Sequence, residues 1–178
     1  EKIRLDAIVE NDTFAVREFT ADFASGKMKA TATVNTLSAQ PSAVFKAELQ
    51  GLNLGDVLPA EAGEAQLTGV LSASFQGTAR GRTMPELERS LSGSGRLSVA
   101  NGVLLNLNLL REILQQLSVI PGLTETLMGR LPESYRAKLE EKNTVFQPAD
   151  IPFTAQNGAI ASDRLRVATD SLELSGSG

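Results

Sequence analysis

The chain has 178 residues, of which 42% are hydrophobic, 21% charged and 4% aromatic. This composition is typical of a folded domain, and the length allows one domain with its own core. The absence of Cys and His excludes disulfides, thiolate metal sites and a Ser–His triad. A net charge of −4 gives no electrostatic basis for binding nucleic acid. We therefore expect no metal, no cofactor and no nucleic-acid partner.

The first half of the chain alternates apolar and polar residues, the period of a β-strand with one apolar face. The pattern predicts strands over residues 3–9, 14–23, 28–34 and 45–49. A helical turn over residues 51–59, stopped by Pro59, comes next. A fifth strand over 67–75 leads into a glycine-containing loop over 77–81. Thr83-Met84-Pro85-Glu86 then predicts the start of a short helix that runs to Leu91.

The second half begins with another strand, over residues 96–101. The dipeptide Asn101-Gly102 that ends it is the strongest short signal for a hairpin turn. The period then changes to 3.6, which predicts helices over 107–117, 123–131 and 133–142, the first of them ended by Pro121-Gly122. Strands return over 144–146 and 152–155. A hairpin at Asn157-Gly158 leads into a strand over 160–167, and a turn at Thr169-Asp170 leads into the last apolar residues.

The pentapeptide Leu-Ser-Gly-Ser-Gly occurs twice, at residues 91–95 and 174–178. A strand follows the first copy, and the sequence stops after the second. We interpret the chain as a single domain, 1–178, that is a fragment of a longer protein built from repeated strand units. Its four parts are a strand meander (1–59), central strands (60–105), a helical insertion (106–142) and a closing meander (143–178).

The predicted fold is mainly β (α+β): a strongly curved antiparallel sheet or half-barrel with two or three inserted helices. About ten strands at ~4.8 Å each would give a sheet ~48 Å wide, whereas two helices of ~10 Å diameter cover less than half of it. The remaining apolar surface must be covered by curling of the sheet, by another copy of the unit, or by a ligand.

Four stretches together resemble the AsmA family of bacterial envelope proteins. They are the paired strands of residues 3–35, the short helix GLNLGDVL (51–58), the segment LSGSGRLSVANGVLLNLNLLREILQQL (91–117) and the closing meander of 144–178. The order and spacing of these stretches carry the resemblance, which covers nearly the whole chain. The family has no catalytic signature, so the resemblance implies no catalytic residue.

The resemblance implies a periplasmic domain of a protein held in the inner membrane by an N-terminal helix that this sequence does not contain. It also implies an apolar groove, related to that of the TamB- and YhdP-type bridge-like lipid transfer proteins. The implied role is non-enzymatic: outer-membrane biogenesis and phospholipid transport or homeostasis between the two membranes. The alternative is a scaffold or assembly factor that binds other envelope proteins through its strand edges.

The candidate sites for phospholipid acyl chains are apolar residues on the expected strands and on the first helix. Each has a second interpretation, because the strand residues suit a dry core equally well and the helix could either pack on the sheet or plug a groove. The candidate residues are Ile3, Leu5, Phe14, Val16, Phe75, Leu97, Val99, Leu110 and Leu114.

Overall fold

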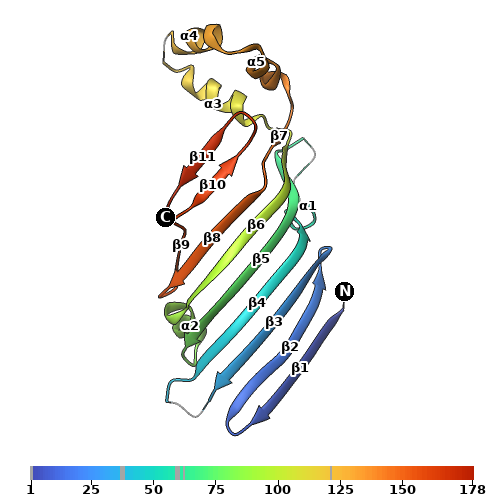
Figure 1. Ribbon diagram of the computed structural model, residues 1–178, viewed down its shortest axis with the longest axis vertical. Coiled ribbons are helices and arrows are strands. Elements are labelled where there is room, and N and C mark those ends of the chain that lie inside the picture. The colour runs from blue at the N-terminus through green and yellow to red at the C-terminus, as the bar shows by residue number, and fades with distance from the viewer. Residues whose placement is uncertain (1, 37–38, 59–60, 62, 121) are drawn as a thin grey trace.

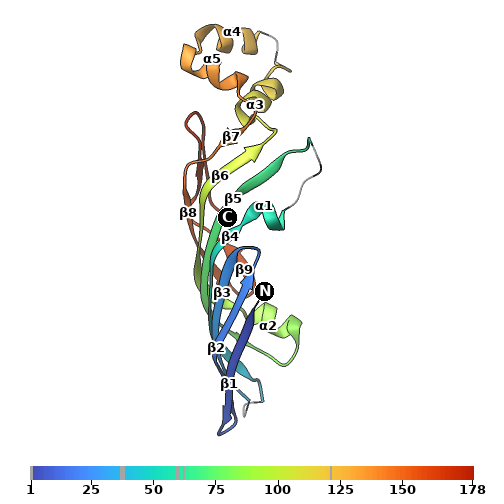
Figure 2. The ribbon, with the colours of Figure 1, turned by 90° about the vertical axis from the view of Figure 1, so that its right-hand side faces the viewer.

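A computed structural model describes residues 2–36, 39–58, 61, 63–120 and 122–178. Nine of its strands form one antiparallel sheet in the order β1-β2-β3-β4-β5-β6-β8-β9, with the short β7 also paired to β6. The strands of this sheet are β1 (Ile3–Glu10), β2 (Thr13–Phe23), β3 (Gly26–Asn35), β4 (Ser42–Asn53), β5 (Gln66–Arg80), β6 (Ser92–Leu105), β7 (Thr144–Val145), β8 (Ala149–Gln156) and β9 (Ala159–Ala161). The sheet is open and curved (Figures 1 and 2), so the predicted fold class is confirmed.

The remaining elements are one small hairpin and five helices. The hairpin pairs β10 (Leu165–Ala168) with β11 (Glu173–Gly176). The helices are α1 (Leu54–Val57), α2 (Met84–Ser90), α3 (Leu109–Leu117), α4 (Leu123–Arg130) and α5 (Glu133–Glu140). The boundary predicted between residues 59 and 60, and the roles expected for Pro59 and Pro121, lie outside the described residues.

Two-residue turns connect several neighbouring strands. Asn11-Asp12 joins β1 to β2 with φ values of 46° and 61°, and Asn157-Gly158 joins β8 to β9 with 52° and 79°. Two successive positive φ values match the right-handed twist of the strands that such a turn connects. The hairpin predicted at Asn157-Gly158 is therefore confirmed.

The hairpin predicted at Asn101-Gly102 is wrong, because this dipeptide forms a bulge inside the continuous strand β6. Val70 pairs with Ala100 and Thr68 with Val103, so two residues of β6 lie opposite the single residue Gly69. Asn101 accommodates the bulge with a φ of 53°. The chain cannot fold back here, because β5 and β8 already occupy both edges of the strand that precedes the bulge.

Two further predicted boundaries differ from the structure. The loop expected over 77–81 is mostly strand, because β5 continues to Arg80 and pairs with β4 and β6 along its length. The strand expected over 160–167 is split into β9 and β10, which belong to different sheets.

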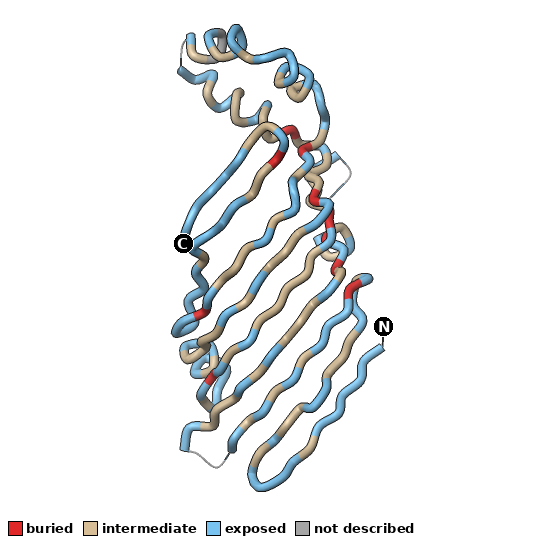
Figure 3. Tube along the Cα trace, in the orientation of Figure 1, coloured by how far each residue is buried: buried red, intermediate tan, exposed pale blue. Residues whose placement is uncertain are grey.

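The sheet has no central core of the kind found in a closed sandwich. Among the described residues, the buried hydrophobic side chains are Leu52, Leu54, Ala79 and Ala155, and no large side chain is fully buried. Figure 3 shows these few buried positions near the ends of the strands. Most of the sheet therefore has solvent on both faces.

Candidate functional site: the apolar face of the sheet

The strand register places apolar side chains on one face of the sheet across all of its long strands. Residues opposite each other in a ladder share a face, so each cross-strand row can be followed from one edge to the other. One row contains Ala7, Val16, Ala32, Phe45, Gly77, Gly93, Ala155 and Ile160. The next contains Leu5, Phe19, Ala30, Ala47, Phe75, Gly95 and Phe153.

Three more rows continue the pattern on either side of these two. They comprise Ile3, Ala21, Met28, Leu49, Ala73, Leu97 and Ile151; Leu52, Leu71, Val99 and Ala149; and Val9, Phe14, Val34, Ala43 and Ala79. We call these five rows the apolar face. None of their members carries a charge or a hydroxyl group, so the face is a continuous aliphatic and aromatic surface.

Two short helices cover the ends of the apolar face. Along β5, Ala79 is buried whereas its neighbours Thr78 and Arg80, which point to the other side, are exposed. This alternation places α2 over the apolar face at that end, where α2 contacts β5. At the other end Leu52, also on the apolar face, is buried beside α1. Figure 2 shows α1 and α2 on the same side of the curved sheet.

In the middle of the apolar face, three phenylalanines of β4, β5 and β8 lie beside the glycines of β6. The ring centroids of Phe45 and Phe75 are 5.7 Å apart, and those of Phe75 and Phe153 are 5.8 Å apart with parallel planes. Phe75 and Phe153 flank Gly95 in the register. A side chain at Gly93 or Gly95 would overlap these rings. The first pentapeptide thus supplies a flat surface beneath two aromatic rings.

The opposite face of the sheet is polar and carries ion pairs. Lys46 lies 2.7 Å from Glu48 on β4, and Arg96 of β6 pairs with Asp150 of β8. The hydrogen bond from Lys46, followed by its charge and that of Lys29, lowers the pKa of Glu48. We call this the polar face; it contacts the solvent over most of its area.

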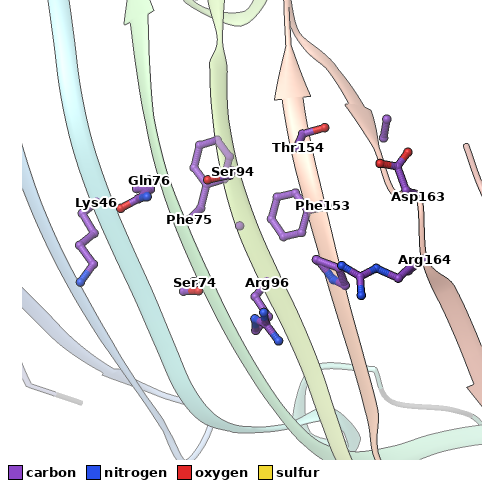
Figure 4. A pocket seen from close by; sticks show the side chains of 13 residues that line it. Lys46, Ser74, Phe75, Gln76, Ser94, Arg96, Phe153, Thr154, Asp163 and Arg164 are labelled. Carbon is purple, nitrogen blue, oxygen red and sulfur yellow. The ribbon is translucent and has the colours of Figure 1, made fainter.

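Two hollows lie mainly on the polar face. One of about 480 Å³ is lined by Lys46, Gln76, Ser94, Arg96 and Arg164, among others (Figure 4). A second of about 710 Å³ lies beside it, over Thr31, Thr33, Val44 and Thr78. Hydroxyl, amide or charged side chains line both hollows, whereas the rows of the apolar face carry none.

The three inserted helices α3, α4 and α5 form a separate appendage. The sequence predicts that α3 packs on the sheet or plugs a groove, but the helices lie beyond the strand ends (Figures 1 and 2). α3 contacts α4 and α5. Leu110 lines a small hollow with Val145 and the β10–β11 turn. Neither Leu110 nor Leu114 belongs to the rows of the apolar face.

A polar cluster fixes the base of the appendage to the sheet. The buried Asn108 caps α3 by accepting a hydrogen bond from the backbone of Arg111, and it donates hydrogen bonds to the carbonyls of Lys138 and Glu141. The Thr144 hydroxyl connects Leu107 and Leu109 to β7. Lys138 forms ion pairs with Glu141 and with Asp170 in the β10–β11 turn.

The structure brings together the seven strand residues among the predicted sites. Ile3, Leu5, Phe14, Val16, Phe75, Leu97 and Val99 all lie on the apolar face. The sequence analysis missed Met28, Phe45 and Phe153, which belong to the same surface. Their alternation with polar neighbours is visible in the sequence, but only the register shows which rows they join. Contact between any of these residues and lipid stays a prediction.

Among the described residues, no group of three or more acidic side chains is placed to hold a metal ion. Asp6 and Glu18 lie opposite each other on the polar face. Other acidic residues of the strands pair with a cation: Glu48 and Asp150 on the polar face, and Glu173 on the β10–β11 hairpin.

Comparison with known proteins places this architecture in a family. The model of the AsmA family matches residues 4–165, which is most of the chain. The chain belongs to the AsmA family. AsmA proteins are associated with the bacterial envelope and with outer-membrane assembly. Neither the curated proteins nor the solved structures contain a match. Within the described part of this AsmA chain, no helix combines the length and the apolar character needed to cross a membrane.

Proposed function

We propose that this AsmA domain is a non-enzymatic periplasmic module that binds phospholipid acyl chains on its apolar face. Its role would be phospholipid transport or homeostasis between the inner and outer membranes, in support of outer-membrane biogenesis. The observation that carries the proposal is the apolar face itself, which spans the sheet and is left open between α1 and α2. Contiguous exposed apolar surface of this kind marks an interaction site.

The dimensions of the apolar face suit a fatty acyl chain. Eight strands in hydrogen-bonded order, at ~4.8 Å each, give a width of ~38 Å. The hydrocarbon core of a bilayer, which holds two opposed acyl layers, is ~30 Å thick. One acyl chain can therefore lie across several strands. Each methylene group removed from water contributes ~0.8 kcal/mol, so even partial coverage would give useful affinity.

The chemistry of the face suits sliding better than fixed recognition. Its side chains are aliphatic or phenyl groups without hydrogen-bonding atoms, so a methylene chain has no preferred register along them. The charged groups of the polar face lie on the other side of the sheet, so they do not face a lipid that is bound on the apolar face. Membership of the AsmA family supports the periplasmic location, and the family resemblance supports an N-terminal inner-membrane anchor in the complete protein.

The lack of His supports a non-enzymatic role, because His is the commonest general base near neutral pH. Bound lipid, rather than a reaction product, is therefore the readout to measure.

The experiment compares lipid uptake by the chain and by two matched pairs of variants. Phe14→Gln and Met28→Gln place amides on the apolar face, whereas Thr31→Gln and Thr33→Gln place them on the polar face of β3. The purified chain should retain phospholipid on extraction and take up a fluorescent phospholipid after delipidation. The apolar-face pair should reduce uptake and the polar-face pair should not. Equal uptake by all variants, or no uptake by the chain, contradicts the proposal.

A further inference from the structure

The hollow of about 480 Å³ on the polar face has the size of a small-molecule site. One cross-strand row contributes four side chains to its lining: Lys46, Gln76, Ser94 and Thr154. Each of them can donate a hydrogen bond, and neighbours in the row are ~4.8 Å apart. The row is therefore a line of hydrogen-bond donors across β4, β5, β6 and β8.

Three cationic side chains line the same hollow. Lys46 lies at one end, Arg164 at the other, and Arg96 between them (Figure 4). Among the described residues of the lining, Asp163 has the only carboxylate. We call this site the cationic hollow, because its lining carries three positive charges and one negative charge.

Arg164 belongs to the loop between β9 and β10, which is fastened to β8. The hydroxyl of Ser162 donates a hydrogen bond to the carbonyl of Pro152 at 2.7 Å and accepts one from the backbone N–H of Arg164 at 3.3 Å. The guanidinium of Arg164 forms no salt bridge within the described part of the chain. The loop thus holds a cation beside the hollow without supplying a salt-bridge partner for it.

The other two cations have partners that a ligand could replace. Arg96 pairs with Asp150 and Lys46 pairs with Glu48, and neither carboxylate lines the hollow. Both ion pairs are exposed to solvent, and exposed pairs of this kind contribute little to stability. An anion in the hollow would therefore exchange a weak contact of Arg96 for one with a ligand.

We propose that the cationic hollow binds a phosphate group. A guanidinium matches phosphate oxygens in a bidentate manner, and the hollow presents two guanidinium groups, from Arg96 and Arg164. Ser94 and Gln76 add neutral donors for further oxygens. A phosphate has the charge and the number of oxygens to use both arginines and the donor row, whereas a carboxylate has only two oxygens. The site lies on the polar face, so it does not depend on lipid binding to the apolar face.

Calorimetric titration of the chain with inorganic phosphate and with glycerol 3-phosphate tests the site. Both probes should bind, and Arg164→Gln should weaken binding about tenfold because it removes a charged donor. The matched control is Lys27→Gln, which removes one positive charge from the polar face of β3 outside the hollow. It should leave the affinity unchanged. No binding of either probe, or an equal loss in the two variants, overturns the proposal.

The carboxylate of the hollow provides a test in the opposite direction. Asp163→Asn should tighten phosphate binding several-fold, because it removes the negative charge that faces the same hollow. Asp22→Asn removes a negative charge from the polar face of β2 and should have no effect. Tighter binding of glycerol 3-phosphate than of inorganic phosphate would identify the ligand as a phosphate ester, and the reverse would identify the free ion. Weaker binding by Asp163→Asn, or equal effects of the two Asp variants, overturns the proposal.

Discussion

The rings of Phe75 and Phe153 stack in parallel, 5.8 Å apart, across the glycine that separates them in the sheet. Gly95 lies between their strands, and its missing side chain is what lets the two rings approach. The pair stands on the apolar face next to Phe45, and it connects β4, β5, β6 and β8 in a sheet that has few buried contacts. The glycine and the two rings form one packing unit.

Gly95→Ala should therefore lower the free energy of unfolding by ~1–3 kcal/mol, because the new methyl group overlaps the ring of Phe153 and the backbone of β5. Urea denaturation measures the loss. In the second copy of the pentapeptide, a methyl group at Gly176, which corresponds to Gly93, would meet only the Leu165 side chain, 4.0 Å away. Gly176→Ala should change the free energy by less than ~0.5 kcal/mol. Equal losses of unfolding free energy at the two glycines would contradict the claim that Gly95 packs against the rings of Phe75 and Phe153.

The bulge in β6 depends on a left-handed residue. Asn101 has a φ of 53°, a conformation that costs a β-branched residue ~1–2 kcal/mol. Asn101→Val should lower the melting temperature, and Asn101→Gly should leave it nearly unchanged. If both variants have the melting temperature of the wild type, the left-handed conformation of Asn101 does not stabilise the bulge.

Asn108 connects α3 to the end of α5 through three hydrogen bonds from a buried position. Asn108→Ala should cost ~1–3 kcal/mol of unfolding free energy, because it removes three hydrogen bonds made by a buried side chain. Asn108→Asp should cost more, because it retains the cap but directs a carboxylate at two carbonyl oxygens. Asn53 caps α1 from an exposed position, so Asn53→Ala should cost only ~0.5–1 kcal/mol. Wild-type stability in the Asn108→Asp variant would contradict this account.

Lys138 should make the attachment of the appendage sensitive to alkali. Hydrogen bonds to Asp170 and then Glu141 raise the pKa of Lys138 in the folded chain. Because the folded pKa exceeds the unfolded one, the stabilisation is complete below the unfolded value near 10.5 and is lost as the pH rises through the folded value. Amide exchange around Asp170, corrected for its intrinsic pH dependence, should accelerate only in that alkaline range. Lys138→Met should show no such step, and a step at neutral pH would contradict the assignment.

Much of the sheet was predictable from local patterns. The alternation in residues 3–34 predicts β1, β2 and β3, and the dipeptide Asn157-Gly158 predicts the turn between β8 and β9. Each of these elements pairs with its neighbour in the sequence. The three helices over 107–142 also follow from their own period. The strand members of the candidate site were predictable for the same reason, because alternation assigns each of them to one face.

Features that depend on distant partners were not predictable. Asn101-Gly102 has the local signature of a hairpin, but β5 and β8 hold β6 straight on both sides of it. The role of Gly95 depends on Phe75 and Phe153, which flank it in the register and lie far from it in the sequence. Leu110 and Leu114 lie on a helix with a clear apolar stripe, yet a stripe does not specify whether its partner is a sheet or another helix.

The most direct measurement of acyl-chain binding uses a photo-reactive phenylalanine at two adjacent residues of β3. Met28 lies on the apolar face and Lys29 on the polar face, so the two probes differ in side but hardly in position. After irradiation with phospholipid in detergent-free buffer, the probe at residue 28 should form a lipid adduct detectable by mass spectrometry, and the probe at 29 should not. Equal labelling at both residues, or labelling at 29 alone, would contradict the assignment of acyl chains to the apolar face.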